Sequence, residues 1–332
     1  MARMHLTAVV PGSLVPAPLA AELTASLAAP TLARLLRGSS AASESTAAPG
    51  LADATWLAHE VYGVPPPAPT APYAWAVLEG TNDEQLHLWQ ADPVHIAIGR
   101  DSLIVQDLGN AMPSAAEADA LISAANEALR PAGCALQRQG AGWFLRADRA
   151  WTMTPRPLSA VLGQQVPVTG ADDGDALHWS RLLNEIQMRW HADPVNRDRE
   201  ANGLPVINSL WLHGGGTWSS RTPLRWPRVH TQRVDLQGLA IAAGASIARP
   251  DDAVHGDALL VWDDALSCAR EADWSGWLVA MQAIDRRLAS LPPSATLELV
   301  MTGRERIRVR CARPSDRYCF WRRTALEEAL AE

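Results

Sequence analysis

The last third of the chain alternates short apolar runs with a long amphipathic stretch, and this order constrains the fold more than any other feature. Residues 258–262 and 296–302 are apolar runs of strand length, and the apolar positions of residues 274–291 between them have helical spacing. A strand, a helix and a second strand in this order form a parallel βαβ unit. We therefore predict an α/β fold built on a doubly wound, mostly parallel sheet.

The middle of the chain has a different sequence pattern, with short segments of alternating polar and apolar residues instead of long apolar runs. Residues 94–98 and 103–105 have the pattern of a hairpin. The helix expected over residues 115–129 begins with a capping box made of Ser114 and Glu117. This combination is typical of a small α+β module.

The α/β pattern and the α+β pattern together define the expected domain organisation. A long amphipathic helix over residues 175–191 closes the α+β segment, and the apolar run 206–212 after it has the pattern of a buried strand. We expect an α/β core made of two chain segments, 1–90 and 200–332, with an α+β module inserted at 91–199.

Composition restricts the partners and the location. The formal net charge is −7, so broad attraction to nucleic acid is not expected. The four cysteines include no CxxC pair, which argues against a zinc ribbon and a disulfide framework. No apolar run reaches the roughly 20 residues of a membrane span, and residues 1–10 lack the pattern of a signal peptide. We expect a cytoplasmic protein that binds neither nucleic acid nor a membrane.

An arginine-rich stretch, residues 304–323, is the local exception to this negative charge. Arginine and apolar residues alternate over residues 306–310. This alternation predicts a half-buried strand with a solvated basic face, and a polyanion site is the alternative.

The most distinctive stretch is residues 182–216, in which a helix, a polar loop and a buried strand follow one another closely. It resembles the pattern near the return from the inserted domain in the archaeal-type cofactor-independent phosphoglycerate mutases. Asp193 stands where that family has histidine. Ten residues keep the family's register: Pro194, Val195, Asn196, Arg199, Gly203, Pro205, Asn208, Trp211, Leu212 and Gly214.

Two weaker similarities lie on either side, in the same order as in the family. Residues 29–35 resemble its Thr-Pro-Asn-Leu-Asp-Arg-Leu, and residues 257–288 resemble its strand, acidic metal loop and following helix. The chain is also similar to bacterial proteins labelled RpfE-type regulatory proteins. The resemblance implies an alkaline-phosphatase-like fold, and in the family this fold carries two divalent metals and a serine that becomes phosphorylated.

The residues that this chemistry needs differ in this chain. Pro11 follows the first strand where the family has aspartate, and Ala52 aligns with the nucleophilic serine. The histidine of the acidic loop is missing from residues 263–269, and Arg304 and Glu305 replace an Asp/His pair. The resemblance therefore implies no catalytic residue and no bound metal, although whether the chain is an enzyme stays open.

Two hypotheses address what fills the altered site. Arg304 would repel metals and could act instead as a fixed charge paired with Asp53 or Asp263. In the alternative, two Mn or Zn ions are retained, and a shifted hydroxyl replaces the serine. The hydroxyls considered for that role are those of Ser43, Ser45 and Thr55.

Candidate ligand-binding residues lie in the matched stretch. Arg199, with Asn196 and Asn208, has the groups to grip a phosphate or carboxylate, because a guanidinium binds such anions through two hydrogen bonds. Gly214 and Gly215 could present backbone N–H groups to a phosphate. The structural alternatives are an arginine that ties the loop together and a tight glycine turn.

We expect a catalytically degenerate, pseudoenzyme relative of the mutases with a regulatory or ligand-binding role. Its partner would be a phosphorylated small molecule or a protein. The first alternative is an active metal-dependent mutase or phosphatase with a rearranged site. The second is a protein-interaction scaffold that uses the tryptophans crowded in the second half: Trp211, Trp218, Trp226, Trp262, Trp274 and Trp277.

Overall fold

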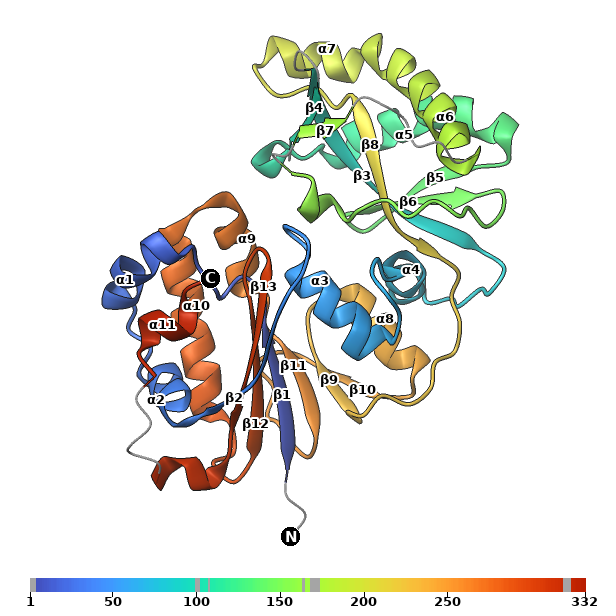
Figure 1. Ribbon diagram of the computed structural model, residues 1–332. Coiled ribbons are helices and arrows are strands. Elements are labelled where there is room, and N and C mark those ends of the chain that lie inside the picture. Colours follow the sequence, from blue (N-terminus) through green and yellow to red (C-terminus); the bar gives the residue numbers. More distant parts are fainter. Residues whose placement is uncertain (1–3, 99–101, 107, 163–164, 168–173, 319–323) are drawn as a thin grey trace. The chain divides into compact units, whose positions relative to one another are not determined.

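The computed structural model describes the chain except for residues 1–3, 99–101, 107, 163–164, 168–173 and 319–323 (Figure 1). The chain forms two compact units. The first, which we call the core unit, combines Met1–Pro66 with Arg221–Glu332, and the second, the inserted unit, is Pro67–Ser220. In the described part of the chain, no helix is both long and apolar enough to cross a membrane.

A seven-stranded sheet forms the centre of the core unit. The strand order is β10-β9-β11-β1-β12-β13-β2, in which the first five strands are parallel and the last two are antiparallel to their neighbours. The prediction of an α/β fold with a mostly parallel sheet is confirmed. The strands are β1 His5–Val10, β2 Ser40–Thr46, β9 Arg228–His230, β10 Ser246–Ala248, β11 Ala258–Val261, β12 Thr296–Thr302 and β13 Arg306–Ala312.

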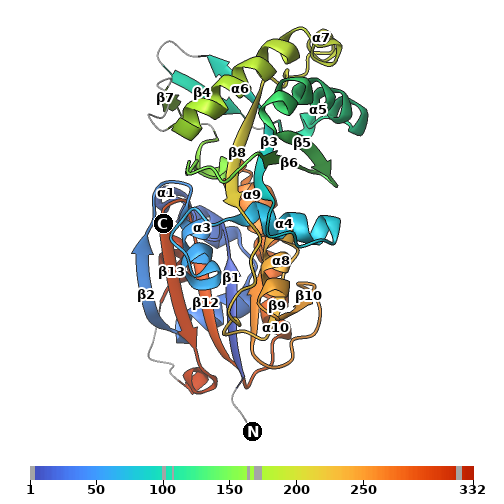
Figure 2. The ribbon, with the colours of Figure 1, turned by 90° about the vertical axis from the view of Figure 1, so that its right-hand side faces the viewer.

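The central strands β1 and β11 are buried along almost their whole length, because helices cover both faces of the sheet. Figures 1 and 2 show α1, α2, α10 and α11 on one face and α3 and α8 on the other. The first group packs through a cluster that includes Leu32, Trp277 and Ile284. The helices are α1 Ala17–Ser26, α2 Pro30–Gly38, α3 Ala52–Leu57, α8 Val234–Ala242, α9 Asp264–Glu271, α10 Trp274–Ser290 and α11 Leu326–Leu330.

Strand β13 has the alternation that its sequence predicts. Ile307 and Val309 are buried, and the arginines between them are half-buried. Arg306 and Arg308 both form ion pairs with Glu44 of the neighbouring strand β2, at 2.7 and 3.2 Å. Two of the three arginines on this face are therefore paired within the sheet, and Arg310 donates to the hydroxyl of Thr324.

An antiparallel sheet forms the inserted unit, in the order β5-β6-β3-β4-β7 with β8 also paired to β3. Helices α5 and α6 pack on one face through a core that includes Leu121, Ile186 and Trp190. The predicted capping box at Ser114 and Glu117 is present. The elements are α4 Thr70–Glu79, β3 His87–Ile98, β4 Ser102–Gln106, α5 Ala115–Leu129, β5 Ala135–Gln139, β6 Gly142–Ala147, β7 Gln165–Pro167, α6 Gly174–His191, α7 Pro194–Ala201 and β8 Ser209–Gly216.

The inserted unit is longer at both ends than the 91–199 expected from the sequence. Strand β3 begins at His87 and pairs with β6 and β8, and α4 packs on β3 and β8. The segments 1–90 and 200–332 expected to form the core therefore contain elements of the inserted unit. These elements are α4, the start of β3, and β8.

Candidate functional site

The carboxyl ends of parallel strands in an open α/β sheet are where ligands of such folds bind. In the core unit, this edge is formed by the residues that follow β1, β9, β11 and β12. Arg233 follows β9 and Asp263 follows β11. Thr302, the last residue of β12, is buried, and its hydroxyl has no hydrogen-bond partner in the described part of the chain.

Arg233 holds the centre of a polar cluster at this edge. Its Nε and Nη2 atoms donate to the two carboxylate oxygens of Asp235, at 3.1 and 2.8 Å. The hydroxyl of Tyr62 donates to the same carboxylate at 2.9 Å. Burial alone would raise the pKa of Asp235, but the charge and hydrogen bonds of Arg233 outweigh it, so the pKa lies below its ordinary value.

Local sequence explains how this pair forms. Arg233 is the N-cap of α8, and Asp235 lies in the first turn of the helix. A carboxylate in the first turn interacts favourably with the helix dipole. The spacing of two residues then lets the guanidinium fold back onto the carboxylate with both of its hydrogen bonds made.

Two further carboxylates interact electrostatically with this arginine. The charge of Asp53, the second residue of α3, helps to raise the pKa of Arg233. Asp53 also forms a 3.7 Å ion pair with Arg270 of α9. Burial raises the pKa of Asp263, and the charge of Arg233 offsets part of that rise. We call these side chains the edge cluster: Asp53, Tyr62, Arg233, Asp235, Asp263 and Arg270.

The edge cluster does not have the donor set of a site for two divalent metals. Such a site needs several carboxylates or imidazoles converging on each ion. Among the described residues, no three His, Cys, Asp or Glu side chains are grouped so that they could hold a metal ion. Two carboxylates of the edge cluster instead contact guanidinium groups, Asp235 that of Arg233 and Asp53 that of Arg270, and these groups repel cations.

The position aligned with the nucleophile carries no hydroxyl. Ala52 is the first residue of α3, and it is fully buried. Ser43 and Ser45 are exposed on β2, the outermost strand of the sheet, and Thr55 lies further along α3. The structure therefore places two of the three alternative hydroxyls on the outer strand.

Arg304 does not join the edge cluster. Its side chain is exposed, and it forms no ion pair with the described residues. The arginine bonded to Asp235 in this cluster is Arg233, which was not among the candidates from the sequence. The available signal was an arginine and an aspartate two residues apart, shortly after a short strand.

Three candidates in the inserted unit have polar side chains: Asn196, Arg199 and Asn208. All three side chains form hydrogen bonds with other groups of the same unit. The side chain of Asn196 donates to the carbonyls of Trp190 and Ile207 and accepts from the N–H of Ile207, at 2.8–2.9 Å. Asn208 accepts from the N–H of Ile96 and donates to its carbonyl. Asn196 therefore joins α7 to α6 and to the loop, and Asn208 joins the loop to β3.

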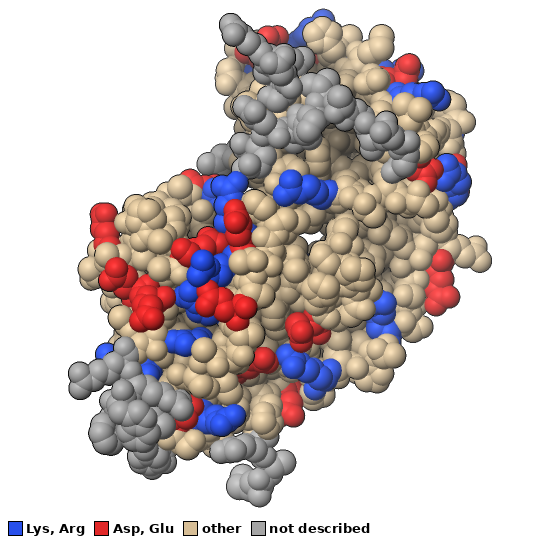
Figure 3. Space-filling model, in the orientation of Figure 1, with Lys and Arg blue, Asp and Glu red and all other residues tan. Residues whose placement is uncertain are grey.

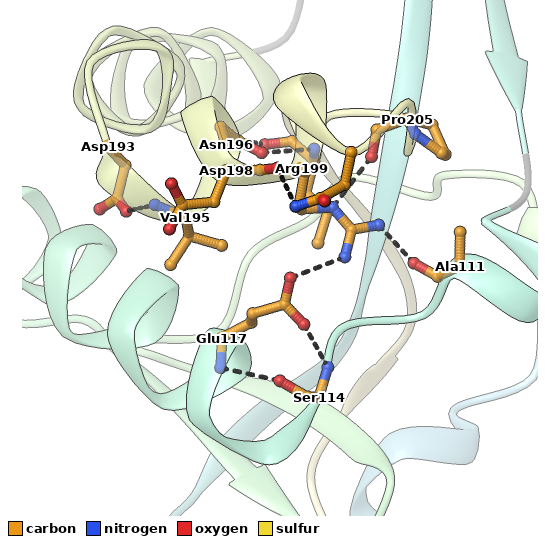
Figure 4. A network of polar contacts seen from close by, with 11 residues as sticks. Ala111, Ser114, Glu117, Asp193, Val195, Asn196, Asp198, Arg199 and Pro205 are labelled. Atoms are coloured by element: carbon orange, nitrogen blue, oxygen red, sulfur yellow. Dashed lines mark hydrogen bonds and ion pairs between the residues drawn. The ribbon is translucent and has the colours of Figure 1, made fainter.

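Arg199 is almost completely buried and has the same structural role (Figure 4). Its guanidinium donates to the carbonyls of Pro205 and Ala111 and to the carboxylate of Glu117. Burial tends to raise the pKa of Glu117, but hydrogen bonds from Ser114 and Arg199 lower it overall. The geometry thus favours an arginine that ties the loop to α5 over one that grips a ligand.

Gly214 and Gly215 are explained by close packing. The register between β3 and β8 shifts at this point, as in a β-bulge. A Cβ atom on Gly214 would lie 2.1 Å from the hydroxyl of Thr70, and one on Gly215 would lie 2.3 Å from the Trp89 ring. Only glycine fits at these two positions.

The distribution of charged side chains and the burial of the tryptophans bear on the other partner classes. On the face shown in Figure 3, basic and acidic side chains are interspersed without a large patch of one sign. The six tryptophans proposed for a scaffold surface are buried or half-buried, with Trp226, Trp262 and Trp277 in the core. The packing of these three is that of core residues.

Comparison with known proteins gives a fold relationship. No family model matches the chain, and no curated protein matches it in sequence. The PH0037 protein from Pyrococcus horikoshii has a similar structure, with a TM-score of 0.55 and 12% identity over 99% of this chain and 93% of that chain. The cofactor-independent phosphoglycerate mutase from Thermoplasma acidophilum DSM 1728 gives a TM-score of 0.43 at 12% identity over 98% of this chain and 95% of that chain, which is too low to carry an argument. At this identity, the chain shares the fold of PH0037, and the comparison extends no further.

Proposed function

We propose that this chain is a phosphoglycerate-mutase-like protein that lacks the metal-and-serine chemistry of the mutases and acts as a regulatory or ligand-binding protein. One observation carries the proposal. Arg233 stands at the carboxyl edge of the sheet, bonded to both carboxylate oxygens of Asp235 and close enough to Asp53 and Asp263 to interact with their charges. Its positive charge repels divalent ions from this edge.

The ligand class of the proposed role is a phosphorylated small acid. The resemblance in residues 182–216 supports this class, as does the general use of this sheet edge for ligands. The internal bonding of Asn196, Arg199 and Asn208 removes the side chains first considered for contact with it. The edge of the core unit is therefore the better place for the ligand.

Turnover of 3-phosphoglycerate in the presence of Mn tests the loss of chemistry. We expect none from the wild type and none from Ala52→Ser, because a restored hydroxyl would still lack metals to activate it. An active metal-dependent mutase serves as the assay control. Turnover by the wild type would establish the alternative of a rearranged active enzyme.

Thermal unfolding with added 3-phosphoglycerate tests the binding role. A ligand that binds only the folded state raises the melting temperature by mass action. We expect such a rise without added metal. If the melting temperature does not move and no turnover occurs, the scaffold function becomes the better account.

A further inference from the structure

The turn that connects β12 to β13 binds a carboxylate through its backbone. The N–H groups of Arg304, Glu305 and Arg306 donate to the side chain of Glu332, at 2.9, 2.5 and 2.8 Å. Both carboxylate oxygens take part. Three successive N–H groups that converge in this way form a nest, a concavity that binds anions. We call these three N–H groups the 304–306 nest.

Gly303 is required for the anion to approach. A Cβ atom on this residue would lie 2.6 Å from the carboxylate carbon of Glu332 and from one of its oxygens. This distance is far below normal van der Waals contact. The space beside Gly303 therefore accommodates the oxygens of an anion. A residue larger than glycine at position 303 would fill this space.

The surrounding chain holds the nest rigidly. The N–H of Gly303 donates to the carbonyl of Arg306 at 2.9 Å, which closes the turn. The N–H groups of Ala47 and Gly50 donate to the carbonyls of Glu305 and Arg304, at 2.7 and 2.8 Å. The donors are thus fixed before any anion arrives, which lowers the cost of binding.

The carboxylate of Glu332 is not what attaches its own segment to the core unit. The N–H of Glu332 donates to the carbonyl of Val15 at 2.8 Å, and the N–H of Val15 donates to the carbonyl of Leu330 at 2.9 Å. The side chain of Leu330 is fully buried. The segment is therefore held by its backbone and by Leu330, and the carboxylate is free to be exchanged for another anion.

The nest lies at the carboxyl end of a parallel strand, the edge where ligands of such folds bind. We propose that the 304–306 nest is a binding site for a phosphate or carboxylate group, and that Glu332 fills it as an internal competitor until a ligand displaces it. In the proposed function, the nest holds the acidic group of the ligand. The biological role of the nest therefore rests on the proposed function. The site itself rests only on the hydrogen bonds of the turn.

Replacement of Glu332 by alanine tests the site with inorganic phosphate as the probe. Glu332→Ala vacates the nest, so phosphate should raise its melting temperature on the order of 2 °C at about tenfold excess over Kd, with saturation. Sodium chloride of equal ionic strength is the reference, and sodium acetate tests whether a carboxylate suffices. Glu327→Ala, which removes an exposed glutamate of α11, is the matched control and should respond no more than the wild type.

Backbone NMR identifies where the probe binds. In Glu332→Ala, phosphate should shift the amide signals of residues 304–306, and adding Gly303→Ala should abolish both these shifts and the thermal response. A Glu332→Ala protein that responds equally to phosphate and chloride, with unmoved signals for these amides, overturns the site. If Glu332→Ala does not fold, the same titration of Glu332→Gln decides the matter, because phosphate should displace the neutral amide. These results are independent of turnover, so the nest and the proposed loss of catalysis can fail separately.

Discussion

Two arginines anchor the polar networks of this protein, one in each unit, and their partners give them different roles. Arg199 in the inserted unit bonds to two backbone carbonyls and to Glu117. Arg233 in the core unit bonds to Asp235 and interacts electrostatically with two more carboxylates. The first arginine joins a loop to α5, whereas the second neutralises acidic groups at the carboxyl edge of the sheet. The resemblance indicated Arg199 as a ligand-binding residue, but the contacts give Arg199 a structural role. Arg233 therefore bears more directly on the proposed function.

The largest effect is expected for Arg199→Met. It leaves two buried carbonyls without donors and Glu117 without its cation, which should lower the free energy of unfolding by about 3–4 kcal/mol. Urea unfolding followed by tryptophan fluorescence measures this loss. Arg197→Met, at an exposed position on the same helix, should change stability by less than about 0.5 kcal/mol. Similar small effects from both variants would contradict a structural role for Arg199.

Arg233→Met should cost less, about 2 kcal/mol, because the arginine side chain keeps 24% of its surface exposed. The loss should depend on pH. In the wild type, Arg233 holds the pKa of Asp235 below its ordinary value, so this interaction stabilises the fold above the unfolded pKa and fades as the pH falls through the folded one. In the variant, Asp235 is buried without its cation, so its protonation at lower pH should relieve the penalty.

The double variant Arg233→Met with Asp235→Asn sharpens this comparison. It removes the uncompensated charge, so it should recover at least half of the stability lost in Arg233→Met when both are unfolded with urea at pH 7. No recovery would mean that Arg233 acts through packing instead of charge.

Tyr62→Phe should have a smaller effect, about 1 kcal/mol, because it removes one hydrogen bond to Asp235 and leaves the ring in place. Thermal unfolding measures the change. Tyr73→Phe is the matched control, since the hydroxyl of Tyr73 lies 3.4 Å from Ser219, a longer contact. An equal loss in the two variants would show that the hydrogen bond to Asp235 has no special weight.

The smallest effect concerns a pair in the inserted unit. Hydrogen bonds from Arg149 and Thr152 lower the pKa of Asp175 to about 2, from an ordinary 3.8. The unfolded chain therefore binds more protons between these values, and the pair stabilises the fold above this window and loses its effect as the pH falls through it. The stability difference between wild type and Asp175→Asn should shrink on acidification from pH 5 to pH 2. A difference that does not change with pH would exclude titration of Asp175.

Local patterns in the sequence were enough to predict several elements of the core sheet, but not the short strands β9 and β10 or the polar strand β2. The apolar runs around residues 258–262 and 296–302 are the strands β11 and β12, and residues 274–290 form α10. Strand β1 lies between β11 and β12. That arrangement brings together residues about 250 positions apart, so periodicity alone could not give it.

The boundary between the two units and the edge cluster could not be predicted from the sequence, because both depend on contacts between residues far apart in the chain. Strand β8 completes an antiparallel pair with β3, whose residues lie more than 110 positions earlier, so the sequence assigned β8 to the core. The edge cluster draws Asp53, Tyr62 and Arg233 from separate elements. The 304–306 nest is made of backbone N–H groups, which carry no residue signature at all.

The central proposal is that the edge cluster, with Arg233 in it, does not bind divalent metal ions. Metal content is its most direct test: the purified protein is dialysed against Mn and Zn, freed of loosely bound ions, and analysed by mass spectrometry. We predict far less than one ion per chain. Two stoichiometric ions per chain would contradict the account.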